Sequence, residues 1–325
     1  MKLGRVLTAA MALAGACLLC GSAGAGEWRV PGDFPTIQAA IDSRLVEDGD
    51  VLRVLPGRRS GATVTKAVAI RALDCVTIVD GPVVNTLGKA GFLFPGGGAG
   101  SGATVDGFRF ENVAFPVFSR GADDVSVTRN TMHGANQGVT NWANGAWGKG
   151  WDITHNTILD LRTGCGGGIG ILIGDYNGGT VTGNLIAHNK VRGRVRVPRG
   201  DCGGYNAPGI VLFADWRYPG DTGARITGNR VAKNRVSVSS GNLDLVTVAG
   251  VELSIAGDFA VGLDIADNAV VYNDLRGMDV PVALTPDELS TVNRIEKNLT
   301  GPVVRSLDSA LRALPPAGAE AAPSR

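Results

Sequence analysis

Apolar residues alternate with polar ones along most of this chain, in short runs separated by glycine and asparagine. A period of two places successive side chains on opposite faces of a strand, so each run predicts a strand with one buried face. A longer repeat lies over this alternation, in which a β-branched residue is followed three positions later by asparagine. The asparagines of this repeat are Asn130, Asn156, Asn184, Asn229, Asn268 and Asn298.

We interpret these six asparagines as one stack of corners between strands. Asparagine tolerates the left-handed backbone that a sharp corner requires. Its amide can also bond to the same amide in the next coil, which would form a ladder. Three repeats carry a second asparagine five residues later, at Asn189, Asn234 and Asn273. The unequal intervals between corners are typical of a solenoid, because insertions fall in its surface loops.

A second kind of strand begins with glycine followed by valine or isoleucine. It recurs at Gly138, Gly170, Gly209 and Gly250. Each coil is therefore expected to contain strand, loop, strand, asparagine corner, strand and loop. We predict an all-β fold, a right-handed parallel β-helix solenoid of eight or nine coils over residues 26–305.

The two ends of the solenoid carry different signals. Residues 33–42 predict a short N-terminal capping helix, with Ile37, Ala40 and Ile41 on its apolar face. Residues 306–325 predict a closing helix up to Leu314 and then a disordered tail rich in proline and alanine.

The first 25 residues predict a signal peptide. Lys2 and Arg5 precede an apolar run over residues 7–19, and Ala23-Gly24-Ala25 gives the small residues that a signal peptidase reads. We expect a secreted or periplasmic protein, with lipid attachment at Cys17 as an open alternative. No later stretch is long and apolar enough to span a membrane. The net charge of +1 speaks against a general nucleic-acid-binding surface.

Two cysteines occupy equivalent places in the repeat. Cys165 and Cys202 each open a Cys-Gly-Gly sequence and precede a Gly-Ile strand. A disulfide between neighbouring coils is the preferred interpretation, and two free thiols in loops are the alternative. Cys75 is expected to be an inert core residue.

The chain resembles the pectin-lyase-like superfamily and its generic right-handed β-helix repeat proteins. The resemblance rests on the sequence FPTIQAAID at residues 34–42, on GDVLRVLPG at residues 49–57, and on the Ile-Thr-Gly-Asn and Gly-Ile elements. It implies the fold over about residues 27 to 300. It implies little about function, because that superfamily includes lyases, glycosidases, esterases, epimerases, adhesins and accessory proteins.

The catalytic signatures of these enzymes are missing from the sequence. Enzymes of the superfamily tend to place the cleft over the Gly-Ile strand, whose outward positions here are Thr140, Leu172, Val211 and Glu252. One carboxylate among mostly apolar side chains is a poor acid–base pair. The sequence therefore names no catalytic residue, and whether the protein is an enzyme stays open.

A basic strip is the first candidate binding feature. Lys190, Arg192, Arg194 and Arg196 alternate with valines or glycine, and the repeat places Arg235 beside Lys190. Alternation puts these charges on one face of a strand. Arginine binds carboxylates and sulfates in pairs of hydrogen bonds, so the strip suits an acidic polysaccharide. A solvated face that prevents edge-to-edge aggregation is the alternative.

An acidic and aromatic corner is the second candidate feature. The polar–aromatic pairs after successive Gly-Ile strands are Asn141-Trp142, Asp175-Tyr176, Asp215-Trp216 and Asp258-Phe259, with Trp147 and Arg217 in the same loops. Tryptophan faces stack on sugar rings. No cofactor is predicted, although stacked aspartates leave calcium open. Aromatic side chains that merely seal the coil are the alternative.

Three functional hypotheses follow. The first is a protein that binds or modifies an acidic polysaccharide, as a lyase if it is catalytic, with Lys190, Arg192, Arg194, Arg196, Arg235, Trp142, Trp147, Asp215, Trp216 and Arg217 as its substrate-binding candidates. The second is a non-catalytic structural or adhesin-like β-helix. The third, an accessory protein of a metalloenzyme, has the least support. A groove shared by the basic strip and the tryptophan loops would favour the first hypothesis.

Overall fold

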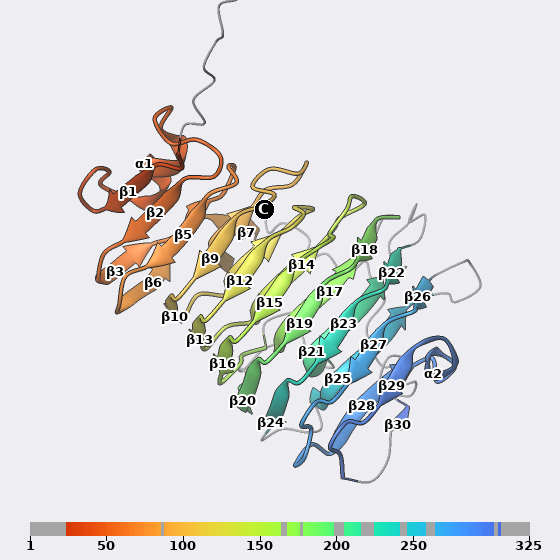
Figure 1. The fold of residues 1–325 in the computed structure, drawn as a ribbon. Helices are drawn as coiled ribbons and strands as arrows, with labels where there is room; N and C mark the ends of the chain where they lie inside the picture. The colour runs from red at the N-terminus through yellow and green to blue at the C-terminus, as the bar shows by residue number, and fades with distance from the viewer. Residues whose placement is uncertain are drawn as a thin grey trace, which may run out of the picture.

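The computed structural model describes residues 24–85, 88–163, 168–175, 178–197, 205–215, 224–240, 246–257, 264–301 and 305–306. These residues form a parallel β-helix in which successive coils stack along one axis (Figure 1). Three long sheets run along that axis, and a regular coil gives one strand to each of them. The predicted all-β solenoid is therefore confirmed.

Sheet A contains ten parallel strands. They are β1 (Glu27–Val30), β2 (Val51–Val54), β5 (Ala69–Ala72), β9 (Thr104–Asp106), β12 (Ser126–Thr128), β15 (Asp152–Thr154), β19 (Leu185–Ala187), β23 (Arg230–Ala232), β27 (Ala269–Val271) and β29 (Arg294–Glu296). Sheet A therefore has more strands than the eight or nine coils that the repeat predicts.

Sheet B follows the corner after sheet A and contains seven strands. They are β3 (Gly57–Ser60), β6 (Val76–Asp80), β10 (Arg109–Glu111), β13 (Thr131–His133), β16 (Thr157–Leu159), β20 (Lys190–Val195) and β24 (Arg235–Ser240). The strands β20 and β24 are the longest of this sheet.

Sheet C contains the Gly-Ile strands. Its strands are β4 (Ala62–Thr63), β8 (Gly88–Phe94), β11 (Phe115–Ser119), β14 (Gln137–Trp142), β17 (Ile169–Asp175), β21 (Tyr205–Asp215), β25 (Val246–Ala256), β28 (Val280–Thr285) and β30 (Arg305–Ser306), with β7 (Val83–Asn85) antiparallel to β8. A small fourth sheet lies between sheets C and A and consists of β18 (Thr180–Thr182), β22 (Arg225–Thr227) and β26 (Asp264–Ala266).

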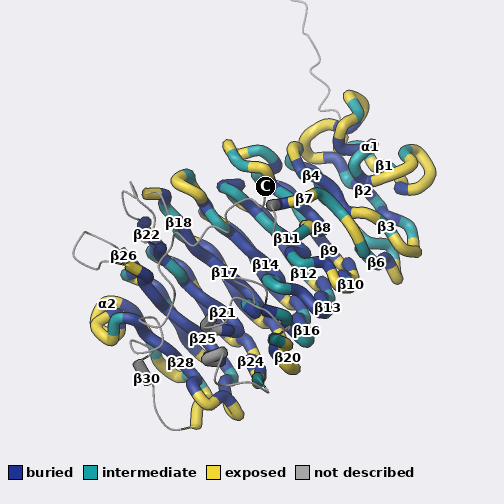
Figure 2. Tube along the Cα trace, turned by 180° about the vertical axis from the view of Figure 1, so that it is seen from behind, coloured by how far each residue is buried: buried dark blue, intermediate teal, exposed yellow. Residues whose placement is uncertain are grey.

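The core is a set of columns of apolar side chains, one from each coil, at the dark positions of Figure 2. One fully buried column of sheet A consists of Leu52, Ile70, Val105, Val127, Ile153, Ile186, Val231 and Val270. β-Branched and leucine side chains fill such a column well, because each packs on its equivalent in the next coil.

The predicted capping helix is present as α1 (Ile37–Asp42). Thr36 is its N-cap, and the Thr36 hydroxyl accepts a hydrogen bond from the Ala39 amide at 3.0 Å. Ile37, Ala40 and Ile41 are buried against the first coil. A second short helix, α2 (Leu289–Val292), lies before the last strand of sheet A.

The corner asparagines form two ladders, where the sequence interpretation assumed one. The first ladder contains Asn130, Asn156, Asn189, Asn234, Asn273 and Asn298. The second contains Asn184, Asn229, Asn268 and Asn293. The single stack was therefore wrong, because some coils carry two asparagine corners, one on each side of sheet A.

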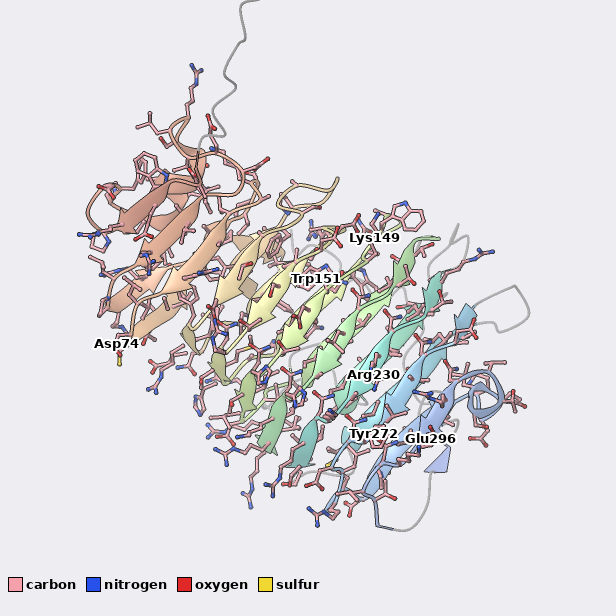
Figure 3. All side chains as sticks on the ribbon, viewed as in Figure 1. Asp74, Lys149, Trp151, Arg230, Tyr272 and Glu296 are labelled. Carbon is pink, nitrogen blue, oxygen red and sulfur yellow. The ribbon has the colours of Figure 1, made fainter. Side chains whose placement is uncertain are left out.

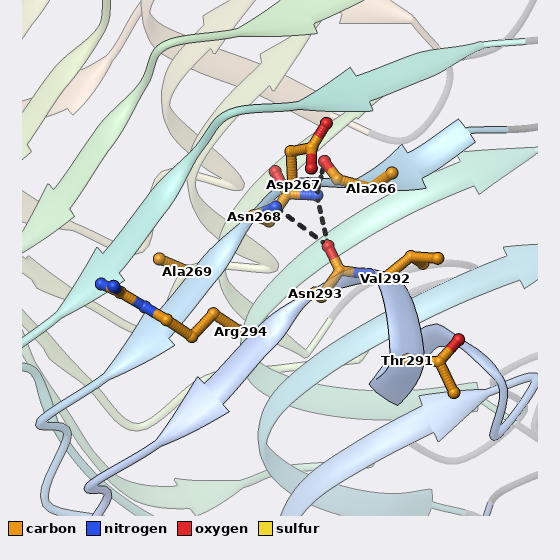
Figure 4. Close-up of a pocket in the computed structure, with 8 residues that line it drawn as sticks. All are labelled: Ala266, Asp267, Asn268, Ala269, Thr291, Val292, Asn293 and Arg294. Carbon is orange, nitrogen blue, oxygen red and sulfur yellow. Dashed lines mark hydrogen bonds between the residues drawn. The ribbon is translucent and has the colours of Figure 1, made fainter.

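Each ladder repeats one hydrogen-bonding pattern. The Oδ1 of Asn189 accepts from both the backbone N and the Nδ2 of Asn156, each at 3.0 Å. The Nδ2 of Asn189 donates to the carbonyl of Ile153 at 2.7 Å and to Oδ1 of Asn234. The end of the second ladder follows the same pattern, with Asn268 donating to Asn293 next to a shallow depression beside α2 (Figure 4).

The asparagines do not themselves adopt the left-handed backbone, contrary to the sequence interpretation. In the first ladder the residue before each asparagine has a positive φ, as at His155 with 59° and His188 with 58°. That residue points outward into solvent, while the asparagine side chain turns inward and is buried. The asparagine is needed for its amide, because the corner would otherwise bury unpaired backbone groups.

The glycines of the Gly-Ile strands are also explained by packing. Gly138, Gly170, Gly209 and Gly250 form a column in sheet C. Ile158, Val191 and Val236 of sheet B pack directly on the backbone of the first three. A Cβ on Gly209 would lie 2.3 Å from Cγ1 of Val236, a distance that no side chain tolerates.

Two further expectations change, and two lie outside the described residues. Cys75 is exposed and is no core residue, because it stands at the corner after Asp74 (φ 65°) and before β6. Ser306 pairs with β28 as part of β30, so no helix begins there. The predicted Cys165–Cys202 disulfide and residues 307–325 lie outside the described residues, as do residues 1–23 of the predicted signal peptide.

We predict that Asn189→Ala lowers the free energy of unfolding by about 2–4 kcal/mol, because it leaves buried backbone and amide groups of two neighbouring coils unpaired. Equilibrium unfolding in urea measures the change. Asn298→Ala is the matched control: this last member of the ladder is only partly buried, so its loss should be clearly smaller. Equal losses at both positions would contradict the structural role of the ladder.

Candidate functional site

The basic strip lies on the outer face of sheet B, on the two neighbouring strands β20 and β24. The register places Lys190 beside Arg235, Arg192 beside Ser237 and Arg194 beside Ser239. These six side chains are exposed. The valines between them are buried in the core, namely Val191, Val195, Val236 and Val238. The predicted alternation and the predicted pairing of Lys190 with Arg235 are both confirmed.

Arg196 extends the strip beyond the end of β20. It is exposed and forms an isolated parallel bridge with Arg162 of the preceding coil. The strip thus presents a cation at every second residue from Lys190 to Arg196. A period of two residues along a strand is about 6.6 Å, so the four cations form a regular row.

Four of these cations have no acidic partner. Within the described part of the chain, Lys190, Arg192, Arg194 and Arg196 form no ion pair. Like charges on adjacent positions repel, so an uncompensated row of this kind stabilises a fold poorly. The row leaves its positive charge exposed to solvent and to anions.

Arg235 differs, because an acid of the next coil faces it. Its guanidinium lies 3.8 Å from the carboxylate of Asp274. The side-chain hydrogen bond from Arg276 to Asp274 is the main cause that lowers the pKa of this carboxyl to about 2. Asp274 therefore stays ionised under ordinary conditions and marks one boundary of the strip.

The strip belongs to a wider basic belt, which we define as residues 178–197 and 224–240. These two segments of neighbouring coils contain eight lysines and arginines and no aspartate or glutamate. The cations are Lys190, Arg192, Arg194, Arg196, Arg225, Arg230, Lys233 and Arg235, and all eight are exposed. The corresponding segments of the coils on either side do contain acids, such as Asp160 and Asp274, so the positive charge is local although the net charge of the chain is only +1.

Asp160, in the coil before β20, accepts a hydrogen bond from the backbone of the strip. Its Oδ1 accepts a hydrogen bond from the backbone N of Arg194 at 3.1 Å, and its Oδ2 lies 3.3 Å from Nε2 of His133. Gly193 has a φ of 104°, and a Cβ there would lie 2.5 Å from Oδ1 of Asp160. The glycine therefore allows Asp160 to reach the backbone of β20.

A ridge of outward residues borders the strip at the corner between sheets A and B. This corner ridge consists of Arg129, His155, His188 and Lys233, one from each of four consecutive coils. The rings of His155 and His188 are stacked, with centroids 5.0 Å apart and an angle of 13° between planes. This ridge was not predicted from the sequence, because the left-handed position was assigned to the asparagine that follows.

The tryptophan candidates divide into a packed and an exposed one. Trp142 is stacked on Phe213 at 6.1 Å across Gly174, whose missing side chain leaves room for the contact. This supports the interpretation that Trp142 seals the coil. Trp147 is 56% exposed and lies under the ammonium group of Lys149 at 5.6 Å. Asp215 is buried, and Trp216 and Arg217 lie outside the described residues.

The basic strip and the exposed tryptophan do not share a groove in the described structure. Trp147 bridges to Thr180 of β18, in the small sheet between C and A. The strands β20 and β24 lie along the opposite edge of the molecule in Figure 1, and Lys149 beside Trp147 is on the β18 side in Figure 3. The combined site of basic strip and tryptophan loops is therefore not formed.

The aspartates of the predicted acidic corner are not in register either. Asp175 is paired with Ala214, and Asp215 is paired with Ala256. Asp175 is fully buried and accepts a hydrogen bond from the Gly145 amide at 2.9 Å. Among the described residues, no three histidine, cysteine or acidic side chains are placed to hold a metal ion. A calcium site at stacked aspartates is not supported by this arrangement.

The outer face of sheet C, where the superfamily's enzymes would place a cleft, is buried. Thr140, Leu172, Val211 and Glu252 are in register, as expected, yet each is at most 5% exposed. A buried face cannot contact a polymer in this conformation. The register of these positions is as expected, but the four side chains are not accessible to solvent.

No protein-family model matches this chain, and neither a search of curated proteins nor a search of solved structures finds a match. Among the described residues, no helix is long and apolar enough to cross a membrane.

We predict that two tryptophans of one loop differ sharply in their contribution to stability. Trp151 is 1% exposed, contacts Phe94 edge to face at 5.8 Å and donates to the Ala122 carbonyl, so Trp151→Ala should cost about 3–5 kcal/mol. Trp147→Ala should change the free energy of unfolding by less than about 0.5 kcal/mol. Thermal unfolding of both variants tests this, and a large loss for Trp147→Ala would show that it is packed in solution.

Proposed function

We propose that this protein binds an acidic polysaccharide along the basic belt, with the strip on β20 and β24 as the centre of the binding surface. The observation that carries the proposal is the local excess of charge: the two neighbouring segments 178–197 and 224–240 hold eight exposed cations and no acid. Four cations of the strip are without an ion pair among the described residues. Such a surface favours a partner with repeated negative charges.

The chemistry of the strip suits carboxylate or sulfate groups. Arg192 and Arg194 each have an exposed serine beside them, Ser237 and Ser239. A guanidinium can hold a planar or tetrahedral oxyanion by two hydrogen bonds, and a neighbouring hydroxyl can donate a third. The rigid sheet fixes the spacing of these groups, which lowers the entropic cost of binding an extended polymer.

The sequence resembles the pectin-lyase-like superfamily, which implies the fold but little about the function. We infer that the chain is a generic β-helix repeat protein of that superfamily, exported by the signal peptide that residues 1–25 predict. An exported protein would meet polysaccharides outside the cytoplasm.

A non-catalytic structural or adhesin-like role is the second candidate. The separation of Trp147 from the strip and the buried outer face of sheet C favour it. In this view the solenoid is a spacer, and the belt keeps its flat face from aggregating. If the protein binds a polymer without cleaving it, it is a binding module, as the first proposal allows. That result would give no support to the structural role.

Affinity electrophoresis in native gels tests the proposed function. Gels are cast with pectin, alginate, chondroitin sulfate or a neutral glycan, and the protein is residues 26–325. We expect retardation in at least one acidic gel and none in the neutral gel. Arg192→Gln/Arg194→Gln should weaken binding roughly tenfold or more at low salt, because two contact charges are lost.

The matched control is Arg44→Gln/Arg71→Gln, which removes two exposed arginines outside the belt and gives the same change in net charge. This control should bind like the parent protein. Equal weakening by both double variants would reduce the effect to net charge, and the absence of retardation in every acidic gel would refute the proposal. Cleared bands after staining for glycan would identify a depolymerising enzyme.

A further inference from the structure

All three histidines of this chain border the basic strip. The chain contains only His133, His155 and His188. His155 and His188 are stacked on the corner ridge at one end of β16 and β20, and His188 precedes Lys190 by two residues. His133 lies on β13 at the other edge, beside the Asp160 that holds β20. The positions of three otherwise unexplained side chains therefore coincide with one surface.

The asparagine ladder fixes the distance between the backbones that carry the two stacked imidazoles. His155 precedes Asn156, His188 precedes Asn189, and these asparagines are bonded through both backbone and side chain at 3.0 Å. The two backbones cannot move apart without breaking the buried ladder. Two imidazolium groups at this separation would repel each other.

The neighbours of the stacked pair add to that repulsion. Along the corner ridge, Arg129 lies one coil before His155, and Lys233 lies one coil after His188. Arg129 forms an ion pair with Asp106 of sheet A. On the strand side the next charges are Lys190 and Arg235. Asp152 is the acid of β15 itself, on the outer face of sheet A.

His133 has a more balanced environment. In register, its neighbours are Glu111 of β10 and Leu159 of β16. Glu111 is engaged with Arg58 at 3.3 Å, while Asp160 faces the imidazole directly. Arg162 is the nearby cation: it donates to Asn112 and would lie 3.2 Å from a Cβ on Gly134. A protonated His133 still adds one positive charge to this edge.

We propose that protonation of these histidines controls the binding of the polyanion, with His155 and His188 as the main contributors. Imidazole is the side chain whose charge ordinarily changes between pH 5 and pH 8. A polyanion on the strip offsets the repulsion among the imidazolium, lysine and arginine groups. Binding and proton uptake therefore favour each other, and affinity falls as pH rises through this range. This inference rests on the proposed function.

Dextran sulfate is the probe that isolates the protein's own titration, because its sulfates stay ionised over the whole range. Its dissociation constant is measured at fixed ionic strength at about pH 5.5 and about pH 7.5. We expect binding about tenfold or more tighter at the lower pH, from roughly fivefold for each imidazolium next to an anionic surface.

Two double variants separate charge from structure. His155→Lys/His188→Lys keeps the charge at both pH values, and Lys233 and Lys297 already occupy equivalent left-handed corners in this fold. It should bind tightly at both pH values. His155→Asn/His188→Asn removes the charge with a residue that tolerates this backbone, and it should bind at both pH values as weakly as the parent does at about pH 7.5. Unfolding curves confirm that both variants fold.

The outcomes distinguish this inference from the proposed function. Equal affinity of the parent protein at the two pH values, with binding present, would overturn the histidine control and leave polysaccharide binding intact. A full pH dependence retained by both double variants would also overturn it. Absence of binding at both pH values would refute the proposed function itself.

Discussion

The buried asparagine amides are the interaction on which the rest of this structure depends. At each corner the chain turns sharply between two strands, and the backbone groups of the turn are cut off from water. The Oδ1 of one asparagine accepts hydrogen bonds from the backbone N and the Nδ2 of the preceding asparagine, each at 3.0 Å. Its Nδ2 donates to a backbone carbonyl of the preceding coil. Each coil is thus bonded to its neighbours through side chains as well as through sheets.

The asparagine corners also determine how side chains are arranged on the surface. Because the inward position is fixed as asparagine and the preceding residue takes the left-handed backbone, that preceding side chain must point outward. Stacking then aligns the outward residues of successive coils in rows at the spacing of parallel strands. Charges placed on two neighbouring coils become a belt, and histidines placed at two neighbouring corners become a stacked pair. The solenoid core thus sets the geometry of the surface, and only the outward residues decide what it binds.

The fold could be predicted from sequence because the repeat reports it directly. The alternation of apolar residues predicted the strands and their inward faces. The apolar spacing within residues 33–42 predicted α1. The two ladders were not separable, because an asparagine every 26 to 45 residues does not reveal which of two corners it occupies. In the structure Asn156 donates to Asn189 and not to Asn184. This contact decides which asparagines belong to the same ladder.

The candidate site was predicted in part for a similar reason. The strip at Lys190, Arg192 and Arg194 is a property of one strand, and alternation is enough to find it. Its extension to Arg225, Arg230 and Lys233 depends on knowing which coils are adjacent. The pairing of Trp142 with Phe213 across Gly174, and of His133 with Asp160, joins residues far apart in the sequence. No local pattern marks contacts of that kind.

The dependence of dextran sulfate affinity on salt concentration is the most direct test of the central claim, that the cations of the basic strip contact the polymer. Each contact charge releases about one counterion. The logarithm of the association constant should fall linearly with the logarithm of the salt concentration, and Arg192→Gln/Arg194→Gln should reduce the slope by about two. A slope that is the same in the parent protein and the variant would show that these arginines do not contact the polymer.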